Sequence, residues 1–234
     1  MRKNKTYDNI SEENKRRVVK VENLQKKLEK IIAQNEKEGI RPSLLLHACC
    51  APCSSYCIEY LHKYFDITLF FYNPNIFPAD EYEYRVSELK RLVAEMGLSI
   101  PVLETENDTE SFYALAKGRE NIREGGVRCF DCYRLRLEKT AQLAKEKGFD
   151  YFTTTLSISP LKNSAKLREI GLELEGEYGV KNLPSDFKKK EGYKRSIELS
   201  KKHNLYRQDY CGCEYSVRSK GQGPNESQTS DQQP

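Results

Sequence analysis

Short apolar runs alternate with longer amphipathic segments through the middle of this 234-residue chain. Four of the runs have the length and the β-branched or aromatic content of buried strands. They span 44–48, 67–72, 99–104 and 151–156. The segments with helical periodicity span about 54–64, 80–96, 131–147, 165–177 and 193–203. Alternation of this kind predicts an α/β fold, with a parallel sheet covered by helices on both faces.

The two ends of the chain differ from this middle part in composition. Residues 1–40 are highly charged and carry apolar residues such as Leu24 and Leu28 at helical spacing, which predicts a charged helical extension. Residues 219–234 are Gly, Pro, Ser, Gln and Asn with almost no apolar content, which predicts a disordered tail. We therefore expect one domain over residues 41–218.

The composition excludes a membrane protein. Charged residues make up 32% of the chain and hydrophobic residues 38%. The longer apolar stretches, such as 67–72, fall far short of the roughly 20 residues that cross a bilayer. The first residues lack the apolar stretch of a secretory signal, so we expect a cytoplasmic location, where thiols stay reduced.

The eight cysteines are closely spaced in the sequence. They are Cys49, Cys50, Cys53, Cys57, Cys129, Cys132, Cys211 and Cys213. In a reducing compartment such groups are typical of metal ligands or redox carriers. Ligands of parallel sheets bind at the carboxyl ends of the strands, and the first strand ends at Cys49. The loop after the fourth strand opens at the same edge, so we expect the site there.

Two of these groups have the spacing of metal ligands. Side chains of successive strand residues point to opposite faces, so Cys49 and Cys50 must lie on an irregular turn, which Pro52 favours. Cys129 and Cys132 fall at a predicted helix start, where both sulfurs lie on one side and the helix terminus favours thiolates. Four thiolates from two loops suit a 4Fe–4S cluster or a structural zinc, and the spacing does not separate them.

The remaining cysteines carry different expectations. Cys211 and Cys213 are separated only by Gly212, so a disulfide between them would close a tight, easily reduced ring. That suits a two-electron relay, and two further metal ligands are the alternative. Cys57 lies one helical turn past Cys53, and we expect it to be a buried apolar residue. For Cys53 the sequence does not decide between a metal ligand and a buried apolar residue.

The histidines and the basic residues give weaker signals. His47 suits either a hydrogen-bond donor to the cysteine site or a core histidine, whereas His62 and His203 are expected on exposed helix faces. Residues 181–207 hold nine basic and three acidic residues, a net charge of +6 against +4 for the whole chain. This segment suits either binding to phosphates or a solvated helix face.

Five motifs in this chain, taken in order, resemble the QueH-type epoxyqueuosine reductases. They are His47-Ala48-Cys49-Cys50-Ala51-Pro52-Cys53-Ser54; Tyr72-Asn73-Pro74-Asn75-Ile76 with Glu81, Tyr82 and Arg85; Val127-Arg128-Cys129-Phe130-Asp131-Cys132-Tyr133-Arg134-Leu135; Thr154-Thr155-Leu156-Ser157-Ile158-Ser159-Pro160 with Lys162 and Asn163; and Tyr210-Cys211-Gly212-Cys213. The resemblance covers about residues 41–218. It implies reduction of epoxyqueuosine to queuosine at the wobble position of tRNA, the last step of queuosine biosynthesis.

The resemblance also implies a fold and a set of site residues. The fold would be Rossmann-like, similar to the adenine nucleotide alpha-hydrolase (HUP) group. The cysteine loop stands where that group often carries a phosphate loop, so ATP-dependent chemistry is not expected. The implied cluster ligands are Cys49, Cys50, Cys129 and Cys132. The implied catalytic redox pair is Cys211 and Cys213, and Cys53 is a candidate ligand of an additional mononuclear iron.

The implied reaction needs partners and a proton source. The partners would be tRNA carrying epoxyqueuosine in the anticodon and an unidentified electron donor. Removal of an epoxide oxygen takes two electrons and two protons, and the proton donors nearest in sequence are Asp131, Asp209 and Tyr210. The alternatives are a tRNA sulfur-transferase on the same fold and a zinc-stabilised RNA-binding module.

Overall fold

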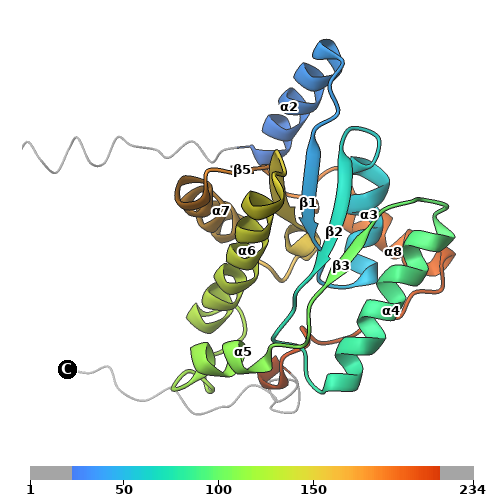
Figure 1. The fold of residues 1–234 in the computed structure, drawn as a ribbon. Coiled ribbons are helices and arrows are strands. Elements are labelled where there is room, and N and C mark those ends of the chain that lie inside the picture. The colour runs from blue at the N-terminus through green and yellow to red at the C-terminus, as the bar shows by residue number, and fades with distance from the viewer. Residues whose placement is uncertain (1–22, 217–234) are drawn as a thin grey trace, which may run out of the picture.

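A five-stranded parallel sheet organises the protein in the computed structural model, which describes residues 23–216 (Figure 1). Its strands lie in the order β3-β2-β1-β4-β5. They are β1 (Ser43–His47), β2 (Asp66–Phe71), β3 (Val102–Glu104), β4 (Tyr151–Thr154) and β5 (Lys181–Asn182). All four neighbouring pairs run parallel, which confirms the predicted α/β class.

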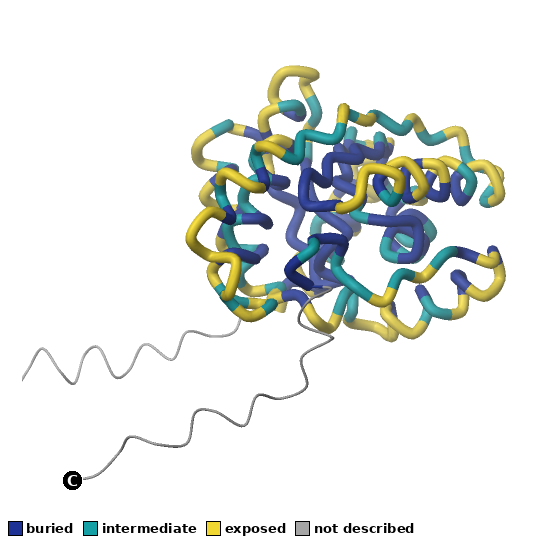
Figure 2. Tube along the Cα trace, turned by 90° about the horizontal axis from the view of Figure 1, so that it is seen from below, coloured by how far each residue is buried: buried dark blue, intermediate teal, exposed yellow. Residues whose placement is uncertain are grey.

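Helices cover both faces of the sheet. One side carries α3 (Ala51–Leu61), α4 (Ala79–Glu95) and α8 (Gly192–Lys202), and the other carries α6 (Val127–Lys147) and α7 (Ser164–Tyr178). Alternate residues of β1 serve the two sides: Leu44 and Leu46 pack in the core with α3 and α4, and Leu45 packs in the core with α6 and α7. Figure 2 shows these buried layers inside a largely exposed outer rim.

The predicted N-terminal helix is present as α2 (Leu24–Glu38). It begins after Asn23, whose side chain accepts a hydrogen bond from the amide of Lys26, and it ends at Gly39 in the left-handed region (φ 67°). Leu28 is fully buried in the same core cluster as β1 and α3. The apolar face of α2 therefore packs onto the main core. The predicted tail at 219–234 lies outside the described residues.

Several boundaries differ from the sequence prediction. The third strand has only three residues, all after Pro101. The fourth strand ends early because its last residue, Thr154, caps a 3₁₀ helix, η1 (Thr155–Ile158), with its side chain. Helix α5 (Thr109–Ala116) and strand β5 were not predicted. His203, expected to be exposed, is 9% exposed because it packs beside Glu95 of α4. No described helix is long and apolar enough to cross a membrane.

Polar contacts with α4 hold the chain that follows α8. Arg91 donates hydrogen bonds to the carbonyls of His203 (3.1 Å) and Asn204 (3.2 Å). The amide of Tyr206 donates to Glu88 at 3.1 Å. This segment then leads to Cys211 at the carboxyl edge of the sheet, so the contacts fix where its last residues lie.

Candidate metal and redox site

The cysteine loop joins β1 to α3 at the carboxyl edge of the sheet. Cys50 is the N-cap of α3, and its extended backbone (φ −173°, ψ 164°) precedes a first turn that contains Pro52. The amide of Cys49 donates to the hydroxyl of Thr155 (3.2 Å), which donates to the Cys49 Sγ (3.3 Å). Thr155 follows β4, so the site lies between two strands whose crossovers run in opposite directions.

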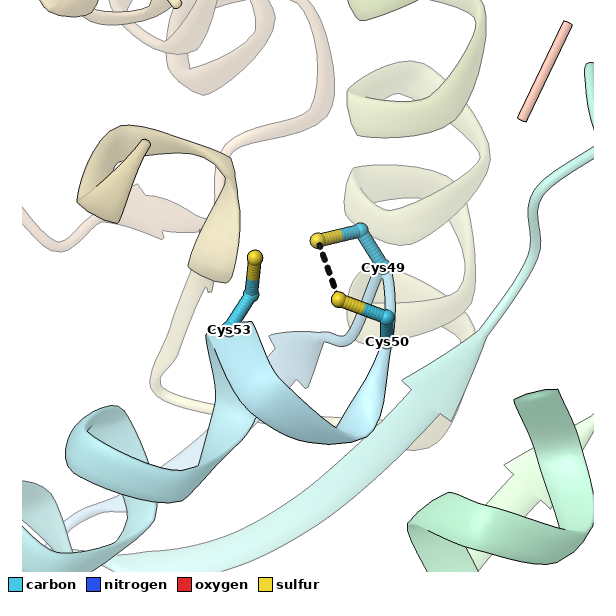
Figure 3. A group of neighbouring side chains, drawn as sticks. All are labelled: Cys49, Cys50 and Cys53. Atoms are coloured by element: carbon cyan, nitrogen blue, oxygen red, sulfur yellow. Dashed lines mark hydrogen bonds between the residues drawn. The ribbon is translucent and has the colours of Figure 1, made fainter. Parts of the chain in front are cut away.

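Three cysteine sulfurs meet in this loop. The Sγ atoms of Cys49, Cys50 and Cys53 all lie within 4.8 Å of one another, and those of Cys49 and Cys50 are 3.9 Å apart (Figure 3). Thiolates gathered this closely are typical ligands of soft metals and of iron–sulfur centres. The spacing groups Cys53 with the other two as a candidate metal ligand.

Hydrogen bonds among these three thiols shift their pKa values in different directions. The Cys49 thiol lowers the pKa of Cys50, and Cys50 in turn raises the pKa of Cys49 to about 11. The pKa of Cys53 is raised by its hydrogen bond with Cys49. Without a metal, negative charge in this group is therefore best placed on Cys50, because its neighbours stabilise that thiolate.

The second cysteine pair lies in the first turns of α6. Gly126 caps this helix, and a Cβ there would lie 2.6 Å from the Ile122 side chain. The amide of Gly125 lies 3.2 Å from the Cys129 Sγ, to which it donates. Burial raises the pKa of Cys132 to about 12. Cys129 belongs to a core cluster against which Cys49 packs, whereas Cys132 packs in a second cluster with Cys213.

The predicted cysteine ligands and redox cysteines line two neighbouring cavities. The larger, of about 210 Å³, is lined by Cys49, Cys50, Cys53 and Cys211 among others. The smaller, of about 10 Å³, is lined by Cys129, Cys132, Cys213 and again Cys211. Cys57 lines neither cavity. It is fully buried in the core, where its thiol donates to the Cys53 carbonyl at 3.3 Å, which confirms its predicted apolar role.

Two buried arginines belong to the site; the sequence placed Arg85 in a motif without assigning it a role and did not single out Arg136. Arg85 and Arg136 are each 2% exposed and line the larger cavity. Arg136 donates to the Cys132 carbonyl (3.1 Å) and to Asn73 (3.4 Å). Within residues 23–216, the Nη2 atoms of both arginines are buried without a hydrogen-bond partner. Buried guanidinium groups with unused donors fit an anionic occupant of the site.

A buried lysine adds a third cation. Lys162 is 8% exposed, and its Nζ lies 3.0 Å from a Glu124 carboxylate oxygen and 3.1 Å from the Cys211 Sγ. Its proximity to Cys211 joins residues 49 positions apart. Lys162 stands in one of the sequence motifs, but its role could not be predicted because Glu124 and Cys211 come from two other loops.

The structure separates the predicted proton donors. Asp131 forms an ion pair with Arg119 and is not among the residues that line the cavity. Asp209 and Tyr210 both line it. Asp209 and Tyr210 therefore remain candidates at the cavity. The Tyr210 hydroxyl donates to the Phe77 carbonyl at 3.1 Å.

His47 supports the cysteine loop from the core. Its Nδ1 lies 2.8 Å from the Thr154 hydroxyl and its Nε2 lies 3.0 Å from the Tyr72 carbonyl. The imidazole is fully buried, and this burial lowers its pKa to about 4. His47 is therefore a neutral core histidine with both nitrogens satisfied, one of the two predicted roles.

Acidic residues offset part of the basic segment at 181–207. Lys190 pairs with Glu29 of α2, and Arg195 pairs with Glu59 of α3 at 2.7 Å. These partners lie outside the segment, so its local charge is lower than the sequence count indicates. The contacts favour the solvated-face interpretation for the start of α8.

Comparisons with known proteins agree on one family. Residues 44–219 match a family model described as epoxyqueuosine reductase QueH. A relative of that name from Staphylococcus epidermidis is 44% identical over 205 residues, covering 85% of this chain and 86% of the relative. The Streptococcus pyogenes serotype M1 relative is 46% identical over 190 residues, with coverages of 80% and 74%. The Thermotoga maritima relative is 37% identical over 176 residues, with coverages of 75% and 90%.

A solved structure was also found among the matches. It is the U34-tRNA thiolase NcsA from Methanococcus maripaludis with its [4Fe-4S] cluster, at a TM-score of 0.46 and 12% identity. The match covers 84% of this chain and 70% of that one. Similarity at this level carries no argument about function.

Proposed function

Because the chain belongs to the epoxyqueuosine reductase QueH family and is thereby an oxidoreductase, we propose that it removes the epoxide oxygen of epoxyqueuosine in tRNA to give queuosine. The observation that carries this proposal is the pair of adjoining cavities, which bring together seven of the eight cysteines. Thiols in such number beside a 210 Å³ cavity suit redox chemistry on a small group that enters it.

We propose a 4Fe–4S cluster held by Cys49, Cys50, Cys129 and Cys132, with Cys53 as a ligand of an additional iron. Soft thiolate donors suit iron–sulfur centres, and the unused Nη2 donors of the two buried arginines suit the negative charge of a thiolate-bound cluster. The close approach of Cys53 to Cys49 and Cys50 supports its part. When bound, such a centre supplies single-electron transfer and Lewis-acid polarisation of a C–O bond.

The Cys211 and Cys213 thiols supply the remaining chemistry in this proposal. Both are free thiols in the structure. Their oxidation to a disulfide releases two electrons and two protons. The epoxide needs the same number: both of its C–O bonds break, a C=C bond forms, and the oxygen leaves as water. The dithiol therefore supplies both electrons and both protons for one reduction, and an outside donor must reduce the disulfide before the next turnover.

The mouth of the larger cavity suits a nucleoside. Leu161 and Tyr193 line it and are 75% and 37% exposed, which offers apolar surface for a base lifted out of the anticodon stack. Arg207 also lines the cavity and offers a charge for a phosphate. We propose that this rim, rather than the paired residues at the start of α8, contacts the tRNA.

The test is a reduction assay. Anaerobically reconstituted protein is mixed with tRNA carrying epoxyqueuosine and a chemical reductant, and the nucleosides are analysed by mass. We expect the modified nucleoside to lose one oxygen, Cys49→Ser to abolish the loss, and Cys57→Ala to retain it. No oxygen loss from iron-loaded protein would refute the proposal. Transfer of sulfur into the nucleoside would support the sulfur-transferase alternative, and one zinc without iron would support the RNA-binding module.

A further inference from the structure

The two thiols of the Cys-Gly-Cys segment have different surroundings. Cys211 is partly exposed, lines the larger cavity, and accepts a hydrogen bond from the Lys162 ammonium at 3.1 Å. Cys213 is 6% exposed and packs in an apolar cluster with Phe112 and Tyr215. Burial raises the pKa of Cys213. The sulfurs thus differ both in access and in the charge that surrounds them.

The backbone of Gly212 holds the two thiols in these separate environments. Its φ of +111° is a conformation that residues with a side chain rarely adopt, and a Cβ there would lie 3.1 Å from both the Arg85 Nη1 and the Ile76 side chain. Its carbonyl accepts a hydrogen bond from the amide of Phe77 at 2.9 Å. The backbone between the sulfurs is therefore fixed on both sides.

Lys162 is equally well fixed. Its amide donates to the Ser159 carbonyl at 3.2 Å, and the following residue, Asn163, caps α7. Burial lowers the pKa of the Lys162 ammonium, but Cys211 and Glu124 outweigh this and raise it. A buried ammonium with one carboxylate and one sulfur as neighbours is a stable cation, and its position beside Cys211 is fixed by both neighbours.

We propose that Cys211 is the exchanging thiol of the pair and that Lys162, held by Glu124, is the positioning residue that holds the Cys211 sulfur at the cavity and stabilises the thiolate that exchange releases there. Cys213 is then the resolving thiol, which completes the disulfide from its apolar site. The part that these two thiols play in epoxide reduction rests on the proposed function. The difference in reactivity between Cys211 and Cys213 does not depend on it.

The arrangement also defines the class of electron donor, a dithiol. A donor thiolate attacks the Cys211 sulfur of the Cys211–Cys213 disulfide, because the other sulfur is buried. The S–S bond breaks, and Cys213 leaves and takes up a proton. The second donor thiol then attacks the mixed disulfide and releases Cys211 as the thiolate beside Lys162. The donor ends as a disulfide and the pair as dithiol, so two electrons have moved.

The pH dependence follows from the groups around Cys211. Those that interact with it are Lys162, three residues of α6 (Cys132, Tyr133 and Arg136) and Cys213 of its own segment. Glu124 is the carboxylate paired with Lys162. Lys162 is the cation whose ammonium contacts its sulfur. Loss of the ammonium should therefore raise the pH at which Cys211 becomes reactive.

The test is the alkylation rate of each thiol in the iron-loaded, reduced protein. Iodoacetamide is added anaerobically between pH 5 and pH 9, and the labelled peptides are resolved by mass. We expect Cys211 to react at least about tenfold faster than Cys213 at pH 7. Lys162→Met should shift its profile upward by about one pH unit or more, whereas Lys162→Arg should retain most of the rate. Lys166→Met, which removes a partly exposed lysine of α7 that pairs with Glu169, is the matched control and should leave both alkylation rates unchanged.

Trapping gives a second readout. In Cys213→Ser, glutathione disulfide should form a stable mixed disulfide on Cys211, and Cys211→Ser should leave Cys213 unmodified. Equal rates at the two thiols, or an unchanged profile in a folded, iron-loaded Lys162→Met protein, would overturn the proposal. Protection of both thiols by iron would do the same, because it would make them metal ligands. Neither experiment uses epoxyqueuosine, so a failed reduction assay with this asymmetry intact would count against the proposed function alone.

Discussion

Replacement of Arg136 by methionine should have opposite effects on the iron-free and the iron-loaded protein. The guanidinium is 2% exposed, and its Nη2 has no partner within residues 23–216. Its hydrogen bond to Asn73 is long, at 3.4 Å, and the carbonyl of Cys132 also accepts the helical bond from its own turn. In the iron-free protein this is a buried charge without an anionic partner.

The magnitude follows from these contacts. One unsatisfied buried donor costs about 1 to 3 kcal/mol, and burial of an ion costs several kcal/mol when no partner of opposite charge offsets it. We expect Arg136→Met to raise the free energy of unfolding of iron-free protein by about 2 kcal/mol. At about 2 to 4 °C per kcal/mol for a domain of this size, the Tm should rise by about 4 to 8 °C. Loaded with iron, the same variant should lose its metal faster, because a neutralising charge is gone.

The assay is thermal unfolding of the iron-free protein together with iron retention against a chelator. Arg134→Met is the matched control, since Arg134 lies on the same helix, exposed and paired with Glu173 and Glu177. It should change the free energy of unfolding by less than about 1 kcal/mol and leave iron retention unchanged. An iron-free Arg136→Met protein that is clearly less stable than wild type would refute this reasoning.

Three further predictions concern single side chains. Cys129→Ser should lose bound iron, whereas Cys57→Ala should keep it and cost only about 1 to 2 kcal/mol of unfolding free energy; iron analysis that ranks them the other way would exclude the proposed ligand set. Gly212→Ala should cost about 1 to 3 kcal/mol in chemical denaturation because of its positive φ, and an unchanged midpoint would contradict this. Leu28→Ala should cost about 2 to 5 kcal/mol, and a loss below about 1 kcal/mol would mean that α2 contributes little to the core.

The sheet and the position of the cysteine loop could be predicted from the sequence because both depend on local patterns. The apolar runs that became β1, β2 and β4 carry enough buried residues to be recognised in isolation. Strand β5 has two residues, which no periodicity can reveal. The early end of β4 depends on a hydrogen bond between the amide of Leu156 and the Thr154 side chain, which a β-branched composition conceals.

The charged partners of the site could not be predicted in the same way. Lys162 and Arg136 occur in segments with ordinary helical or loop composition, and only the fold shows that they are buried beside cysteines. For Arg136 a partial signal exists, since it follows Cys132 by one helical turn. His203 was misjudged for a related reason: its burial depends on α4, more than a hundred residues earlier.

The attachment of the chain after α8 to α4 has a consequence for how a donor reaches the site. Leu205 anchors the start of this segment in the core, but Tyr206 and the residues near it depend on hydrogen bonds to Glu81 and Glu88. Such bonds contribute about 0.5 to 1.5 kcal/mol each, far less than the packing of the sheet. The place of Cys211 therefore depends on a few polar contacts with α4 as well as on the core. A protein donor would meet Cys211 at the partly exposed part of a segment that α4 holds, while the cysteines of α3 and α6 stay on their own helices.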